Sequence, residues 1–343
     1  MRVMTMRETR SGGAGAGTRR RSRHASGAFL GLALLAFGAA SMPVGAQRPT
    51  PMPADSAMVR VIPVQGQVHM VVTGGGNVAV QVGEVGAVLV DSGNPEASPA
   101  LLAEVAKLSP MPIRLLINTS AHPGKLGNNK AVFDVGQAMP GVNQSLGMSV
   151  ISHQKTLDRL VAGDFGAVPD EQWPFNTFFG PKKTLHVNDE VVEILHVPAA
   201  TTDGDVMVHF RRSDVLVTGD FFSTQAYPVW RPEHGGSLQG IIDGLNRVID
   251  ITVPKFNMQG GTLVIPGHGR ISEESDVVEV RDMLTIIRDR VALMIKEGRT
   301  VDQVIAAKPS LEYDGIYGVE PGPSSTQMFL TAVYNELKPQ GGR

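Results

Sequence analysis

Three polar side chains in this sequence follow apolar segments in the same way. They are His122, Asp220 and His268, and each comes directly after a run that predicts a buried strand. If the three strands lie side by side, these side chains meet at one sheet edge, which is where α/β folds commonly place their chemistry. Two imidazoles and one carboxylate form a common ligand set for a divalent metal ion.

The elements that would position these side chains follow from hydrophobic periodicity. Alternation and turn residues predict an antiparallel meander of four strands between residues 59 and 90, and Leu101, Val105 and Leu108 predict a helix over residues 95–108. Further strands are predicted over residues 113–117, 148–151, 184–187, 191–197, 205–210, 215–218 and 262–265. Further helices are predicted over residues 154–161, 236–249, 277–296, 301–307 and 325–337. This order predicts an α/β fold in which two sheets pack face to face with helices outside, an α/β/β/α sandwich.

The composition narrows the function classes. The 343 residues are 42% hydrophobic and 19% charged, which is typical of a globular protein with a sizeable core. The formal net charge is -2 and no basic stripe is present, so we expect no nucleic-acid partner. The absence of cysteine excludes disulfides and thiolate ligands.

The N-terminus has the pattern of an export signal. Arginines cluster over residues 19–23, a short apolar run covers residues 27–42, and Val44-Gly45-Ala46 is a small-residue cleavage site. The apolar run is too short to favour a transmembrane helix. We therefore predict a signal peptide over residues 1–46, a linker over residues 47–58, a periplasmic or secreted location, and no stable membrane span after cleavage.

Several motifs together resemble those of the metallo-β-lactamase-fold superfamily. They are Val90-Asp-Ser-Gly93, Asn118-Thr119 with His122-Pro123, the segment His196 to Asp205, Thr218-Gly-Asp220, and Pro266-Gly-His268-Gly269. The resemblance covers nearly all of the mature chain. It implies a metallo-β-lactamase-like domain over residues 59–271, with a helical C-terminal extension over residues 272–343 packed on it. It also implies hydrolysis by two zinc ions that activate a bridging water.

The sequence departs from the family pattern at four of its seven ligand positions. Ser120, Gly124, Lys125 and Thr201 stand where the family has two loop histidines, a loop aspartate and a later histidine. His122, Asp220 and His268 remain as remnant ligands, and Asp91 is expected to brace the loop behind them. The resemblance therefore implies the fold of the family, and the four substitutions predict that an ordinary dinuclear zinc centre is absent.

Lys125 and Asp220 are the candidate catalytic residues. We expect the Lys125 ammonium to pair with Asp220 and so to compensate a buried carboxylate. Three functions stay open, and with them the question of whether the protein is an enzyme. The first is a pseudo-hydrolase or a protein that binds a small-molecule ligand. The second is a hydrolase of an ester, lactone or amide that uses a single zinc, iron or manganese ion on His122, Asp220 and His268. The third is a metal-free enzyme that uses Lys125.

Other residues are predicted to have structural roles. His153 and His196 lie in or beside predicted strands, and His69 and His234 are expected at the surface. The aromatic-rich segment over residues 162–183 is expected to form a small satellite core, with a pocket roof as the alternative.

Overall fold

The computed structural model describes residues 59–166, 168–253 and 261–338. The predicted signal peptide and linker, residues 1–58, lie outside the described residues, so those predictions stay untested. In the described part of the chain, no helix is both long and apolar enough to cross a membrane.

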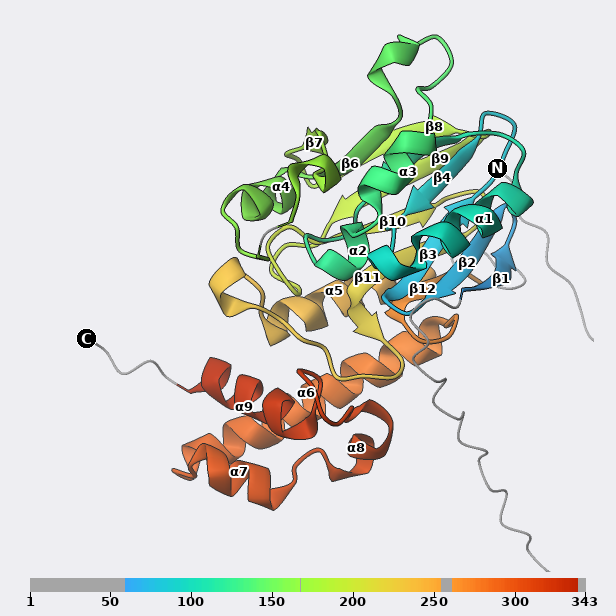
Figure 1. Cartoon of the computed structure of the whole chain (residues 1–343). Helices are drawn as coiled ribbons and strands as arrows, with labels where there is room; N and C mark the ends of the chain where they lie inside the picture. Colours follow the sequence, from blue (N-terminus) through green and yellow to red (C-terminus); the bar gives the residue numbers. More distant parts are fainter. Residues whose placement is uncertain (1–58, 167, 254–260, 339–343) are drawn as a thin grey trace, which may run out of the picture. The chain divides into compact units, whose positions relative to one another are not determined.

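Two β-sheets form the centre of the described part (Figure 1). The first contains seven strands in chain order: β1 Arg60–Gln65, β2 Val68–Thr73, β3 Gly76–Gln81, β4 Ala87–Val90, β5 Ile113–Ile117, β6 Ser149–His153 and β7 Asn176–Phe178. The second has the order β12-β11-β10-β9-β8, with β8 Lys182–Val187, β9 Glu190–His196, β10 Val206–Phe210, β11 Val215–Ser223 and β12 Leu263–His268. Strands β1 to β4 are the predicted antiparallel meander, whereas β5, β6 and β7 join the sheet in parallel.

The two sheets pack face to face through apolar side chains that alternate along their strands. Val88 and Val90 from β4 share a buried cluster with Val206 and Val208 from β10 and with Val217 from β11. Burial of alternate residues on each strand is what period-two patterning predicts for a sandwich.

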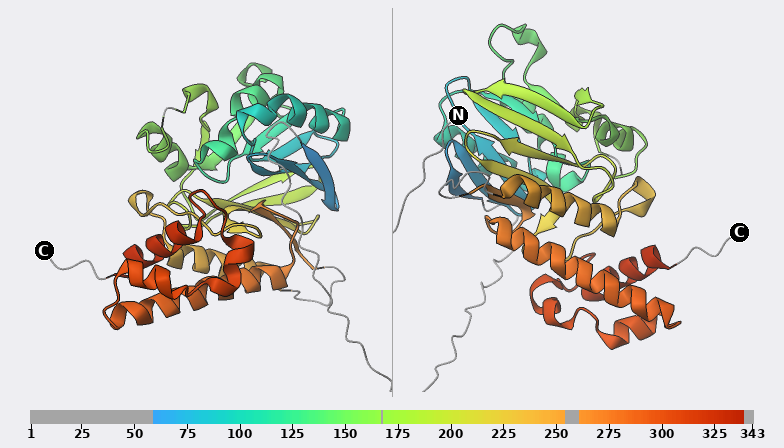
Figure 2. Two further views of the ribbon diagram at one scale, coloured as in Figure 1. Left: turned by 60° about the horizontal axis from the view of Figure 1, so that its bottom comes forward. Right: turned by 180° about the vertical axis from the view of Figure 1, so that it is seen from behind.

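Helices cover both outer faces, as Figure 2 shows. On the first sheet lie α1 Ser98–Leu108 and α3 Asn129–Val135, and on the second lie α5 Leu238–Thr252 and α6 Glu274–Lys296. The C-terminal part continues with α7 Val301–Ala307, α8 Leu311–Tyr317 and α9 Thr326–Leu337, whose apolar side chains share one core with α5, α6 and the second sheet. The remaining helices are α2 Pro123–Leu126 and α4 Gln154–Val161. The predicted α/β/β/α sandwich with a helical C-terminal region is confirmed.

The structure differs from the predicted elements where helices are short. Helix α2, inside the loop after β5, and α8 were not predicted, and α3 occupies part of the unassigned residues 130–147. One or two turns carry too few residues for a periodic apolar pattern, so sequence periodicity misses them. Strand β11 also runs five residues further than predicted, past Gly219, whose φ of 69° and close approach to Thr119 both require glycine.

Candidate functional site

The three motif residues meet where one end of both sheets comes together. His122 follows β5 of the first sheet, whereas Asp220 and His268 lie on β11 and β12 of the second. The prediction that they share one sheet edge is therefore wrong, because β5 pairs with β4 and β6 and not with β11. Hydrogen bonds join the sheets here: Val206 N donates to Thr119 O over 2.9 Å, and Asn77 Nδ2 donates to Pro266 O over 2.9 Å.

A buried lysine lies at the centre of this junction. The side chain of Lys125 is only 1% exposed, and its Nζ lies 2.9 Å from Asp220 Oδ1, the ion pair that the sequence predicts. The same Nζ lies 3.9 Å from Asp91 Oδ2 and donates to Gly267 O over 3.3 Å. Helix α2 points the side chain inward, and Ser92 N holds the Lys125 carbonyl over 2.8 Å.

The pKa values of all three charged groups are shifted from their usual values. Burial is the largest single influence on Asp220 and would raise its pKa, but Lys125, His268 and His122 together outweigh burial and hold this pKa well below the usual range. Burial alone would lower the pKa of Lys125, and Asp220 and Asp91 reverse that shift and raise it. For Asp91 burial dominates and raises the pKa to about 7. At neutral pH the junction therefore holds one ammonium, one firmly ionised carboxylate and one that is close to its midpoint.

Asp91 also braces the loop after β5. Its carboxylate accepts hydrogen bonds from Thr119 N over 2.7 Å and from Thr119 Oγ1 over 2.8 Å, and its backbone has a φ of 65°. A non-glycine residue at this φ is uncommon and needs surrounding contacts to hold it. These bonds fix the end of β5 relative to β4.

The two remnant histidines have defined ring contacts. His122 caps α2, and its Nδ1 accepts a hydrogen bond from Gly124 N over 3.2 Å, which puts the ring proton on Nε2. Burial lowers the pKa of His122, which agrees with a neutral ring. His268 Nε2 lies 3.3 Å from Asp220 Oδ1. A histidine that binds a metal usually donates its second ring N–H to an acceptor, so the bond at His122 has the opposite sense.

Besides Lys125, the substituted positions carry hydroxyl groups or no side chain. Thr201 donates to Asp205 Oδ2 from both its backbone N and its Oγ1, each over 2.6 Å. Ser120 Oγ accepts from His122 N over 3.2 Å. At Gly124 a Cβ would lie 3.2 Å from both Gly75 O and His122 Nδ1, so a larger residue would displace neighbours.

Ser120, His122, Thr201, Asp220 and His268 line one pocket of about 240 Å³, and we call the part of the lining that they form its floor. The pocket is lined by Ser120, His122, Phe165, Thr201, Thr202, Asp220, Ser223, Ala226, Tyr227, Pro228, Val229, Arg231, His268, Pro323 and Ser324. Sequence reasoning missed Arg231 and Tyr227. Both lie in a segment rich in aromatic residues and proline that leaves β11 just after Asp220, and this adjacency was the available signal. Phe165 and Trp173 from the predicted aromatic segment pack on a small separate core with Leu126 and Leu160, as expected, and Phe165 also lines the pocket.

Among the other histidines, His153 and His196 have the structural contacts that were expected, whereas His234 is not at the surface. His153 and His196 stack with ring centroids 3.7 Å apart, and His153 caps α4, so both have structural contacts. The prediction of a surface position for His234 is wrong, because the residue is only 8% exposed. It is the last residue of the short turn Pro232–His234, which places its ring against Phe165 and its Nδ1 3.2 Å from Asp164 Oδ2.

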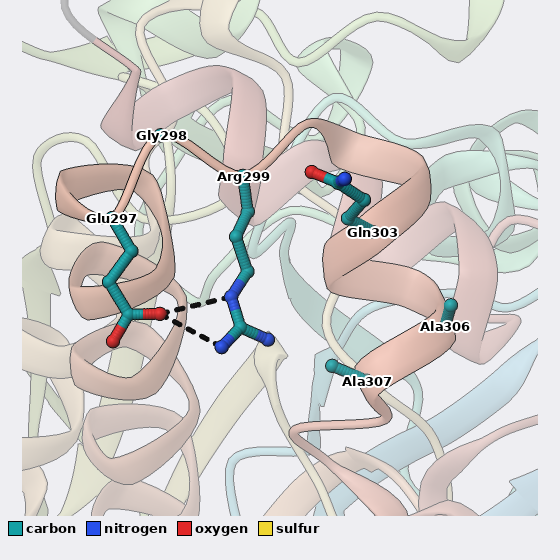
Figure 3. Close-up of a pocket in the computed structure, with 6 residues that line it drawn as sticks. All are labelled: Glu297, Gly298, Arg299, Gln303, Ala306 and Ala307. Atoms are coloured by element: carbon teal, nitrogen blue, oxygen red, sulfur yellow. Dashed lines mark hydrogen bonds and ion pairs between the residues drawn. The ribbon is translucent and has the colours of Figure 1, made fainter.

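A second hollow, of about 610 Å³, lies between the end of α6 and α7 (Figure 3). Its charged groups are Glu297 and Arg299, which pair with each other over 2.9 Å and are both exposed. Alanine side chains complete much of the lining, so this hollow offers no group suited to catalysis.

Sequence comparison assigns the family. The sequence model of the metallo-beta-lactamase superfamily matches residues 71–268, more than half of the chain. The chain belongs to the metallo-beta-lactamase superfamily. Comparison with curated proteins gives no match.

Solved structures show the same superfamily fold at low sequence identity. The stereoselective inverting sec-alkylsulfatase Pisa1 from Pseudomonas sp. is 15% identical with a TM-score of 0.58, and the match covers 81% of this chain and 50% of that one. A metallo-beta-lactamase from Pontibacter korlensis is 19% identical with a TM-score of 0.49, and the match covers 66% of this chain and 99% of that one. The protein described here thus matches about half of the length of the sulfatase.

Members of the superfamily bind zinc or other divalent metals. Within residues 59–166, 168–253 and 261–338, no three His, Asp or Glu side chains are grouped so that they could hold a metal ion. The ammonium of Lys125 lies beside Asp220, the residue at the position of the bridging aspartate in the family motif.

Proposed function

We propose that this metallo-beta-lactamase-fold protein has lost the dinuclear zinc centre and acts as a pseudo-hydrolase that binds a small-molecule ligand in the pocket. The observation that carries the proposal is the buried contact of 2.9 Å between Lys125 Nζ and Asp220 Oδ1. A fixed positive charge at this distance repels a divalent cation that would share the same carboxylate, and repulsion is strong where water is excluded.

The donor set supports the same conclusion. Ser120 and Thr201 offer neutral hydroxyls, and the Thr201 hydroxyl is already bonded to Asp205. His122 carries its proton on Nε2, and the lone pair of its Nδ1 accepts a hydrogen bond from Gly124 N, so in this arrangement neither ring nitrogen has a free lone pair for a metal. The residues present do not fit a pair of zinc ions, and we derive no hydrolytic step through one.

Two alternatives are less well supported. A single zinc, iron or manganese ion on His122, Asp220 and His268 would have to displace Lys125 from Asp220 and reverse the hydrogen bond at His122. A metal-free reaction through Lys125 would need a neutral amine as nucleophile or base, but its pKa is raised by two carboxylates. Both alternatives would require the contact between Lys125 and Asp220 to break.

We propose, from the N-terminal sequence, that the protein acts after export, in the periplasm or outside the cell. The active form would then begin at Gln47. Cell fractionation with and without residues 1–46 tests this, and retention of the full-length chain in the cytoplasm would contradict it.

The metal content of the purified mature protein tests the loss of the zinc centre. Residues 47–343 are dialysed against buffer without chelator, and zinc, iron and manganese are measured by elemental analysis. We expect far less than one metal ion per chain. Stoichiometric retention of any of the three would contradict the proposal.

A variant with restored ligands provides the matched comparison. Ser120→His, Gly124→Asp, Lys125→His and Thr201→His together recreate the family's donor set. We expect this variant to bind zinc where the wild type does not. Because a Cβ at Gly124 lies 3.2 Å from two neighbours, the triple variant that retains Gly124 is measured in parallel.

A further inference from the structure

We propose that the pocket above the Lys125–Asp220 pair binds a small amphiphilic anion, which is an oxyanion headgroup on a short apolar chain. A carboxylate and a sulfate ester share this chemistry. The inference rests on the proposed function, since it takes the pocket floor to be free of metal ions, and it adds the class of ligand.

The floor of the pocket presents hydrogen-bond donors. The Nδ1 of His122 accepts from Gly124 N, so the ring carries its proton on Nε2, the nitrogen that remains for a ligand. Ser120 Oγ accepts from His122 N, and within the described residues its own proton has no acceptor. Two donors on one floor favour an acceptor-rich group, and an oxyanion accepts from both.

The rim adds a positive charge. The guanidinium of Arg231 lies 5.3 Å from the centroid of the Phe165 ring, and within the described residues it donates no hydrogen bond. Its carboxylate partner, Glu233, lies 3.8 Å away and is 60% exposed, so this pair is weak and screened.

The acidic groups around the pocket already have partners within the protein. Asp205, behind the lining residues Thr201 and Thr202, accepts hydrogen bonds from both. Asp220 is paired with Lys125 over 2.9 Å, so these two charges compensate each other. Asp314, which packs behind the wall, accepts a hydrogen bond from the Tyr227 hydroxyl over 2.9 Å. Among the residues that line the pocket, Asp220 and Arg231 carry the charges, and Asp220 has the closer partner, so the charge of Arg231 favours an anion over a cation.

The walls are apolar and the space is small. Phe165, Tyr227, Pro228, Val229 and Pro323 line the sides. The volume of about 240 Å³ is below the range of roughly 300–1,000 Å³ that is usual for drug-sized ligands. A short hydrocarbon chain fits such walls, since it removes apolar surface from water without leaving a polar group unpaired.

Calorimetric titration of the mature protein, residues 47–343, in the presence of a chelator tests the inference. The probes are hexanoate, hexyl sulfate, hexanol and hexylammonium, which share one chain and differ in headgroup. We expect hexanoate or hexyl sulfate to bind at least about tenfold more tightly than hexanol and hexylammonium. This is the difference in affinity expected when one charge-assisted hydrogen bond is missing. The preferred anion identifies the headgroup, and preference for either supports the inference.

Two variants and a control locate the binding. Arg231→Gln and Ser120→Ala should each weaken binding of the preferred anion, by about tenfold for the charged residue. Arg212→Gln, on the exposed turn at the opposite end of β11, should leave it unchanged. The inference is overturned if hexanol or hexylammonium binds as tightly, if neither anion binds at millimolar concentration, or if both variants keep wild-type affinity.

The two proposals fail separately. Stoichiometric metal in the dialysed protein, together with anion binding in chelator, would remove the proposed loss of zinc and leave the ligand class standing. A metal-free protein that binds neither anion would remove only the ligand class.

Discussion

Replacement of Lys125 by methionine removes the buried ammonium while keeping a side chain of similar length. Asp220 would be left without its partner at 2.9 Å, and Asp91 without the one at 3.9 Å. With an effective dielectric constant of about 20, the closer pair alone is worth roughly 6 kcal/mol before desolvation is subtracted. Breaking a buried pair on one side costs about 3–5 kcal/mol, because the remaining charge stays buried. We therefore expect Lys125→Met to lower the free energy of unfolding by about 3–5 kcal/mol at neutral pH.

Urea denaturation followed by circular dichroism measures this loss, with thermal melting as a second readout. At about 2–4 °C per kcal/mol for a domain of this size, the melting temperature should fall by roughly 6–20 °C. Lys130→Met is the matched control, since Lys130 pairs with Asp134 on an exposed helix face and its removal should have no measurable effect. Adding Asp220→Asn to Lys125→Met should recover much of the loss. A Lys125→Met protein within about 1 kcal/mol of wild type would refute the reasoning.

Two further predictions concern stability. Because the folded pKa of Asp91 is raised to about 7 from 3.8, its contribution to stability is complete at low pH and is lost as the pH rises through that interval. Asp91→Asn should therefore make stability less dependent on pH between about 4 and about 7, and an unchanged slope in urea midpoints would contradict this. Gly240→Ala should destabilise α5 although alanine favours helices, because its Cβ would overlap the carbonyl oxygen of Ala199. Gly315→Ala in α8 has open space and should stabilise by up to about 1 kcal/mol, so equal effects in thermal melts would rule out the steric argument.

The sandwich was predictable because its strands and long helices carry strong periodic patterns. The limits predicted for β5 and α4 agree with the structure, since apolar runs bounded by turn residues define them. The meeting of β5 with β11 and β12 was placed wrongly at one sheet edge. Strand order depends on long-range pairing, and a single sequence holds no periodic signal for it.

The ion pair of the candidate site was predictable, and its surroundings were not. Lys125 occupies a ligand position in a loop that keeps Asn118-Thr119 and His122-Pro123 of the family motif, so the resemblance placed it near Asp220 and charge compensation followed from chemistry. The ring orientation of His122 depends on helix α2. This helix is too short for a periodic apolar pattern, so the sequence did not predict it. Arg231 reaches the pocket through the fold of a loop, where backbone geometry and not residue type decides which side chain points inward.

The Lys125–Asp220 pair explains how this fold can lose metal ligands without losing its junction. Asp220 is held on β11 beside Gly219, and Gly267 of β12 lies so close that a Cβ there would come within 2.5 Å of Asp220 Oδ1. A carboxylate fixed in this way needs a cation, since burying it alone would be costly. A metal ion supplies that charge in a hydrolytic centre, and Lys125 supplies it here from the protein itself. If the zinc centre is lost as proposed, this exchange would keep the two sheet ends together and remove the Lewis acid, so that the pocket persists without the group that performs the chemistry usual for the fold.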